Sequence, residues 1–199
     1  YKPGKEVSAT TATAANTPAA PARTVLLIRI DDPITPMIAE FIIKSIDKAA
    51  KQNAEALIIE MDTPGGLVES TREIIKKMLA SEVPIVVYVA PDGSRAASAG
   101  VFITLTANIA AMAPNTRMGS ASPVQMEGKM DETMAKKVTN DLAAMIRGIA
   151  EKRGRNAAWA EDAVRKSISA TETEALKLGV IDLVAPDVPS LLKKIAGRT

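Results

Sequence analysis

Residues 56–66 have the sequence ALIIEMDTPGG, which joins a buried strand to a glycine turn. The apolar run 56–61 is typical of a strand that is covered on both faces of a sheet. Gly65 and Gly66 then break the strand, and a helix is expected to follow as far as about Ala80. A strand, a turn and a helix in this order form the first part of a βαβ unit, which predicts parallel strands.

The same alternation continues on both sides of this stretch. Residues 24–30 form an apolar, β-branched run that predicts a buried strand, and Thr35 with Pro36 behind it predicts a helix start. We therefore expect an α/β fold of repeated βαβ units, with helices on both faces of a parallel sheet. The remaining strands are expected at 84–90, 108–113 and 180–184, and the helices at 36–52, from about 98, and at 131–152, 157–167, 171–178 and 188–196.

The composition excludes several classes of function. The chain has 199 residues, of which 47% are hydrophobic, and this suits one domain with a sizeable core. A net charge of +2 is close to balance, whereas nucleic-acid binders usually have a concentrated basic face, so we expect no nucleic-acid partner. The sequence has no cysteine and no histidine, which rules out thiolate zinc sites, histidine-ligated metals and a Ser-His-Asp triad. Nucleophilic catalysis in this chain must use another base.

The two ends of the chain differ in character. Residues 1–23 are rich in Ala, Thr and Pro and predict a disordered tail or linker, so the folded domain is expected over 24–199. Because the chain begins with Tyr1 and lacks a signal-peptide pattern, we expect a fragment or a processed form. Residues 96–116 are uncharged and long enough to span a membrane, but their polar residues favour a buried helix followed by a buried strand.

The turn at residues 63–66, TPGG, lies where parallel strands end and where such sheets bind ligands. Two glycines let the backbone turn sharply and present N–H groups to a developing negative oxygen, as an oxyanion hole requires. A tight turn between strand and helix is the simpler interpretation. Asp62-Thr63 does not fit an aspartic-peptidase motif, since Pro64 follows and the second carboxylate is missing.

A second candidate lies in residues 93–100, GSRAASAG. Ser98 is flanked by tiny residues at an expected helix start, so a peptide can approach its hydroxyl, and the positive end of the helix favours negative charge there. A serine that only caps the helix is the alternative. Ser94 is the competing serine and fits a cap or loop position better.

The candidate bases are lysines. In the helix expected at 131–152, Met134, Val138, Leu142, Met145 and Ile149 form an apolar stripe, and Lys137 lies about 100° from its centre, Lys136 about 160°. Lys137 is therefore the better candidate to turn inward, although a solvated helix face is the simpler interpretation. A lysine base must be neutral, which near pH 7–8 requires its pKa to fall by about 3 from 10.4, at a cost of about 4 kcal/mol. Burial can supply this. Lys129, in a loop, is a further alternative.

Taken in order, these motifs resemble the Clp-class serine peptidases, and most closely the membrane-bound ones of the NfeD type. The resemblance extends over about residues 24–185. It is carried by TPGG at 63–66, AASAG at 96–100, MGSASP at 118–123, KVTN at 137–140 and GRNA at 154–157.

The resemblance implies a Clp/crotonase-like fold and a serine endopeptidase with a Ser-Lys dyad. Ser98 corresponds to the nucleophile, Lys137 to the base, and the N–H groups of Gly66 and Ala99 to the oxyanion hole. Ala121 stands at the position where the Clp peptidase has a histidine. Neither a metal nor an organic cofactor is expected.

The resemblance also implies substrates and a location. We expect cleavage of hydrophobic segments in membrane-associated, stomatin-like proteins, by a homo-oligomer that is most simply a dimer. The peptidase domain is expected outside the cytoplasm, held to the membrane by regions absent from this chain.

Three alternatives stay open: a signal-peptide peptidase-like protease, a crotonase-type enzyme that handles acyl-CoA, and a non-catalytic membrane-scaffold module. The segment 115–131 carries Gly119 and Gly128 with little periodicity, and it is expected to be a mobile lid.

Overall fold

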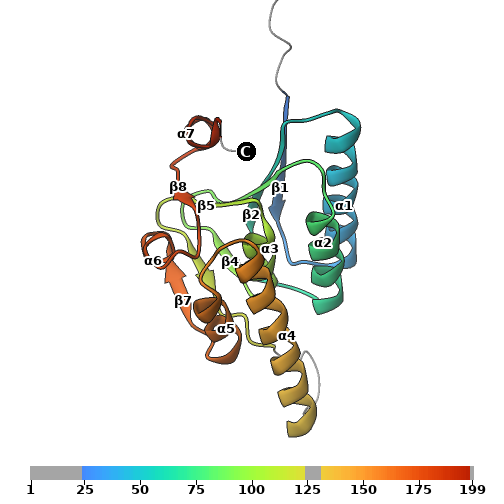
Figure 1. Cartoon of the computed structure of the whole chain (residues 1–199), viewed down its shortest axis with the longest axis vertical. Coiled ribbons are helices and arrows are strands. Elements are labelled where there is room, and N and C mark those ends of the chain that lie inside the picture. The colour runs from blue at the N-terminus through green and yellow to red at the C-terminus, as the bar shows by residue number, and fades with distance from the viewer. Residues whose placement is uncertain (1–23, 124–130, 198–199) are drawn as a thin grey trace, which may run out of the picture.

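A computed structural model describes residues 24–123 and 131–197 of the chain (Figure 1). The expected tail at 1–23 lies outside the described residues. So do Lys129, the loop alternative for the base, and residues 124–130 of the segment expected to form a lid.

The main sheet has five strands in the order β1-β2-β3-β5-β8, and every neighbouring pair is parallel. The predicted α/β fold is thereby confirmed. The last strand is shorter than the sequence predicts, because its pairing with β5 involves two residues. The strands are β1 (Val25–Asp31), β2 (Ala56–Asp62), β3 (Ile85–Val89), β5 (Ile109–Met112) and β8 (Leu183–Val184).

The helices begin and end close to their predicted positions. The side chain of Thr35 caps the first helix, since its Oγ1 accepts a hydrogen bond of 3.3 Å from the backbone N–H of Ile38. The helices are α1 (Pro36–Lys51), α2 (Val68–Leu79), α3 (Ala99–Thr106), α4 (Glu132–Lys152), α5 (Ala157–Arg165), α6 (Glu172–Lys177) and α7 (Val188–Ile195).

Helices lie on both faces of the sheet, as expected, but they cover the two faces unequally. The strands follow one another across the sheet in chain order, and right-handed crossovers therefore place successive helices on the same face. The larger core cluster joins that face to α1–α5, for example through Ile42, Ile74 and Ile103. On the opposite face, a smaller cluster packs Ile58 and its neighbours against α7.

A second sheet of three short strands was not predicted. It contains β4 (Arg95–Ala97), β6 (Arg117–Gly119) and β7 (Ser169–Thr171), with β4 and β6 parallel and β6 and β7 antiparallel. Strands of three residues are too short to show a period, and sequence analysis assigned them to loops. This sheet matters because β4 leads directly into Ser98.

Two arginines hold the far end of α3 in place. All eight residues of α3 are buried, so the carbonyl groups at its C-terminus need partners inside the protein. The Nη1 atom of Arg155 donates to the carbonyls of Leu105 and Ala107, at 2.8 and 2.9 Å, and Arg153 donates to that of Thr106 at 2.7 Å. Arg155 also pairs with Asp182 at 2.5 Å. The helix that begins beside Ser98 is thus fixed at its other end.

We predict that Arg155→Met lowers the free energy of unfolding by about 3 kcal/mol, because Asp182 and two buried carbonyl groups lose their cationic partner. Urea unfolding followed by circular dichroism measures this. Lys44→Met is the control, since it breaks an exposed ion pair with Glu40 and should change stability little. Equal effects of the two substitutions would contradict the anchoring role of Arg155.

Candidate functional site

The TPGG turn is held rigidly from inside the protein. Thr63 is fully buried, its hydroxyl donates to the carbonyl of Asp32 at 2.8 Å, and its Oγ1 accepts from the N–H of Gly65 at 3.2 Å. Ile34 donates to the carbonyl of Gly65 at 2.8 Å and accepts from Leu67 at 2.9 Å. Ile34 and Gly66 form a parallel bridge, so the N–H of Gly66 points away from Ile34.

Ser98 occupies a strained turn between β4 and α3. Its backbone angles are φ 51° and ψ −113°. Ser98 stands at the N-cap position of α3, but its side chain makes no capping hydrogen bond, so the alternative that this side chain caps the helix is wrong. A residue other than glycine at positive φ costs on the order of 1–3 kcal/mol, and such residues gather at functional sites. A sharp strand-to-helix turn of this kind presents the serine hydroxyl outward in hydrolases.

Both glycines of the turn are required by close contacts. Gly65 has φ +114°, and a Cβ added to it would lie 2.5 Å from the Cβ of Ser98 and 3.0 Å from its Oγ. A Cβ added to Gly66 would lie 2.2 Å from the carbonyl oxygen of Ile34. The TPGG turn therefore packs directly against Ser98. A side chain at either glycine would displace the turn or the residue that it contacts.

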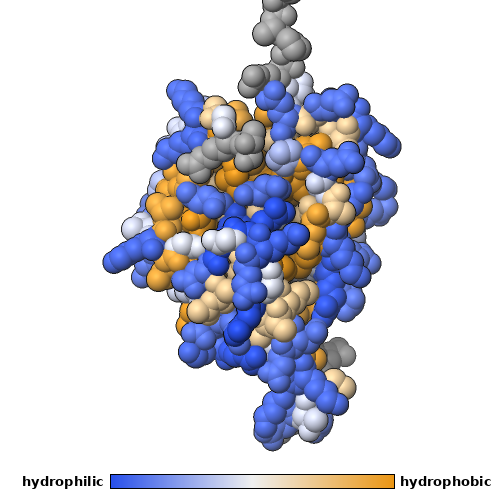
Figure 2. Space-filling model, viewed as in Figure 1, coloured by the Kyte–Doolittle hydropathy of each residue, from blue (hydrophilic) through white to orange (hydrophobic). Residues whose placement is uncertain are grey.

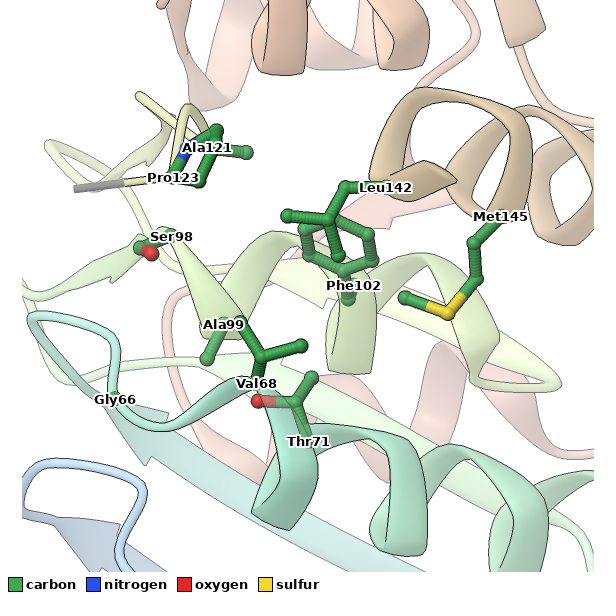
Figure 3. A pocket seen from close by; sticks show the side chains of 10 residues that line it. All are labelled: Gly66, Val68, Thr71, Ser98, Ala99, Phe102, Ala121, Pro123, Leu142 and Met145. Carbon is green, nitrogen blue, oxygen red and sulfur yellow. The ribbon is translucent and has the colours of Figure 1, made fainter. Parts of the chain in front are cut away.

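Two backbone N–H groups beside Ser98 have no acceptor within the described residues. Ala99 is the first residue of α3, and its N–H is one of those that a helix cannot satisfy internally. The N–H of Gly66 is likewise unpaired. Gly66, Ser98 and Ala99 line one pocket (Figure 3). This arrangement can bind a negatively charged oxygen close to the serine hydroxyl.

The rest of this pocket is apolar. Figure 3 shows Ser98 toward one end, with Phe102, Leu142 and Met145 toward the other. Ala121, the position expected to replace the histidine of the Clp peptidase, also lines it. Among the described residues, the lining contains no charged side chain; it is completed by Val68, Thr71 and Pro123.

Ser94, the competing serine, lies elsewhere. It is buried and lines a different cavity, which also contains Asp31, Glu60 and Asp62. Among the described residues that line this second cavity, none also lines the pocket of Ser98. The structure therefore separates the two serines and leaves Ser98 beside the TPGG turn.

Lys137 lies in a neighbouring groove rather than in the pocket of Ser98. The groove is lined by Val68, Glu69, Arg72, Lys137, Val138 and Asp141, and Val68 also lines the pocket. Lys137 is exposed, which corrects the expectation that apolar groups bury it. It makes no hydrogen bond or ion pair within residues 24–123 and 131–197. Lys136 is also exposed and pairs with Glu132 at 2.6 Å.

The position of α4 explains this difference. The predicted apolar stripe is correct at Leu142 and Ile149, which are buried, whereas Met134 is 52% exposed. The first turns of the helix project beyond the sheet (Figure 1), and Figure 2 shows mostly hydrophilic side chains on the projecting end. Lys137 belongs to this part of the helix, where there is little core to cover it.

The sheet, the TPGG turn and the strained serine define a domain of the Clp-like class of folds. Two solved structures of 1510-N, a membrane-bound stomatin-specific protease, are similar to it. A variant with a serine replaced by alanine has a TM-score of 0.82 and 38% identity, and it covers 88% of this chain and 86% of its own. A variant with a lysine replaced by alanine, in complex with a substrate peptide, has a TM-score of 0.83 and 37% identity, covering 90% and 83%.

The chain belongs to the family of the NfeD1b N-terminal domain, whose model matches residues 24–188. It is 40% identical over 176 residues to the membrane-bound protease PH1510 of Pyrococcus horikoshii, and 28% identical over 186 residues to the membrane protein NfeD1b of Bacillus subtilis. Each match covers 87% of this chain but 40% and 41% of those proteins, so the chain spans about two fifths of their length. In the described part of the chain, none of the helices has the length and apolar character to cross a bilayer.

We predict that Gly66→Ala abolishes labelling of Ser98 by a fluorophosphonate, or slows it at least about a hundredfold, because the turn must move and its N–H no longer faces the oxyanion. Labelling rates from intact-protein mass spectrometry measure the effect. Gly148→Ala is the matched control, since a Cβ there meets nothing within 4 Å. Labelling of the Gly66 variant at the unaltered rate would contradict the expected role of the Gly66 N–H as an oxyanion donor.

Proposed function

We propose that this domain is a serine endopeptidase with a Ser-Lys dyad, in which Ser98 is the nucleophile and Lys137 the base. The observation that carries the proposal is the strained serine beside two unpaired N–H groups at the end of an apolar pocket. The similar structures support it further, because a serine and a lysine were the residues replaced in them, one with a substrate peptide bound.

The chemistry follows from these groups. The neutral amine of Lys137 takes the hydroxyl proton of Ser98 as Oγ attacks the peptide carbonyl carbon, and the oxyanion binds the N–H groups of Gly66 and Ala99. The C–N bond then breaks, and Lys137 gives the proton to the leaving amine. Water, deprotonated by the same amine, hydrolyses the acyl-enzyme and releases Ser98.

Substrate binding must bring the two side chains together. Val68 lines both the groove of Lys137 and the pocket of Ser98, and the Lys137 side chain has no partner among the described residues that would hold it in place. A peptide lying over both would exclude water from the amine, which favours its neutral form. Catalytic contacts that form only in the complex are common, so their separation in the free protein agrees with this mechanism.

The pocket supports an apolar substrate. A side chain that enters it contacts Phe102, Leu142 and Met145 and, among the described residues, meets no charge. We accordingly propose hydrophobic segments of membrane-associated proteins as substrates. A stomatin-like protein is the first candidate, because the similar solved proteases are described as stomatin-specific.

The location and the oligomeric state of the domain are part of the same proposal. The relatives are membrane-bound or membrane proteins, which supports a peptidase domain that acts beside a membrane. Its bounds, 24–199, stay a prediction. An extracytoplasmic position and a homodimer stay predictions from the family resemblance.

We predict that Ser98→Ala and Lys137→Ala each lower kcat/KM on an apolar peptide by about 10³-fold or more, because each removes one half of the dyad. Chromatographic assay of the cleaved peptide measures this. Lys136→Ala is the matched control, one residue away on the exposed face, and should keep its activity. Retained cleavage in the Lys137 variant would move the base elsewhere, with Lys136 as the next candidate.

The unaltered protein and these variants also distinguish the three alternative functions. Efficient cleavage of signal-peptide fragments would favour a signal-peptide peptidase, and absence of any fluorophosphonate adduct on Ser98 would favour a non-catalytic module. A crotonase-type enzyme needs carboxylates near the oxyanion hole, and the described pocket lining has none. A rise in melting temperature on addition of CoA would nevertheless favour it.

A further inference from the structure

The groove of Lys137 contains two carboxylates, and one arginine binds both. The charged side chains that line it are Glu69 and Arg72 from α2, and Lys137 and Asp141 from α4. Arg72 pairs through Nη2 with the carboxylate of Asp141, and its Nε lies 3.6 Å from Oε1 of Glu69. Its Nη1 also contacts the sulfur of Met145, at 3.7 Å, in the wall of the pocket of Ser98.

Without Arg72, Asp141 would be the natural partner of Lys137. The two residues are four positions apart on α4, so their side chains lie on the same side of the helix and can form an ion pair. Lys136 illustrates this tendency one residue earlier, since it pairs with Glu132 at the same spacing. Lys137 has no such partner within the described residues, while Asp141 is occupied by Arg72.

We propose that Arg72 is a positioning residue for the base: by binding Asp141 and Glu69, it withholds both carboxylates from Lys137. This inference rests on the proposed function, in which Lys137 must be neutral and must reach Ser98. An ion pair with a carboxylate would stabilise the ammonium form and hold the side chain on the surface of α4. The positive charge of Arg72 in the same groove acts in the same direction, because it disfavours a second cation.

A purely structural role for Arg72 makes a different prediction. If Arg72 served only to tie α2 to α4 and to hold Met145, its loss would lower activity to the same extent at every pH and would not move the pH profile. If Arg72 keeps Asp141 away from Lys137, loss of Arg72 is harmful and loss of Asp141 is not. Asp141→Asn is therefore a matched control that breaks the same ion pair.

The test is the pH dependence of kcat/KM on an apolar peptide. For Arg72→Gln we expect the acidic limb of the profile to move to higher pH by about one unit, a loss of about tenfold below the limb. Asp141→Asn alone should leave the limb in place or move it to lower pH. The triple variant Arg72→Gln, Glu69→Gln, Asp141→Asn should restore it, and Arg72→Lys should retain most of the activity, since it keeps the positive charge.

Two outcomes would overturn the inference. One is a loss in Arg72→Gln that is the same at every pH, which the purely structural role predicts. The other is an Arg72→Gln profile that matches the unaltered protein while Lys137→Ala is inactive; the proposed function then stands and only the role of Arg72 fails. If Lys137→Ala is itself active, the proposed function fails, whatever Arg72 does.

Discussion

The bridge between the TPGG turn and strand β4 is the interaction on which the site depends. The N–H of Thr63 donates to the carbonyl of Arg95 at 2.8 Å, and its carbonyl accepts from the N–H of Ala97 at 3.1 Å. These two bonds join the end of a strand in the main sheet to the strand that leads into Ser98. Together with the hydrogen bonds of the Thr63 hydroxyl, they hold the TPGG turn beside Ser98.

The strain at Ser98 is stable because the structure on both sides of it is firmly held. On one side, β4 is bound to Thr63 and to β6, and the N–H of Ser98 donates to the carbonyl of Gly119 at 3.1 Å. On the other, α3 is fully buried, and Arg153 and Arg155 bind its last carbonyl groups. The backbone conformation of Ser98 costs on the order of 1–3 kcal/mol. Relaxing it would require breaking several of these contacts, so the strained conformation is kept.

The parts of the fold that could be predicted are those with a local signal. The runs at 56–61 and 84–90 are apolar because these strands lie in the interior of the main sheet, and the TPGG turn has its own glycine signature. The run at 24–30 also forms a strand, but it lies at the edge of the sheet and only Ile28 and Ile30 of it are buried, so the expected burial of the whole run is wrong. The second sheet has no such signal. Neither does the exposure of Lys137, which depends on how far α4 projects, nor the pairing of Arg72 with Asp141 across 69 positions of sequence.

The serine side of the candidate site is therefore preorganised in the free protein, whereas the lysine side is not. The nucleophile and the N–H groups are fixed by the backbone and lie in an apolar pocket, while the amine stands in water on a helix surface. On the proposed mechanism, Ser98 is activated only when an apolar segment covers both the pocket and the groove. The substrate then supplies the desolvation that the fold does not, so that hydrophobicity selects the substrate and also activates the base.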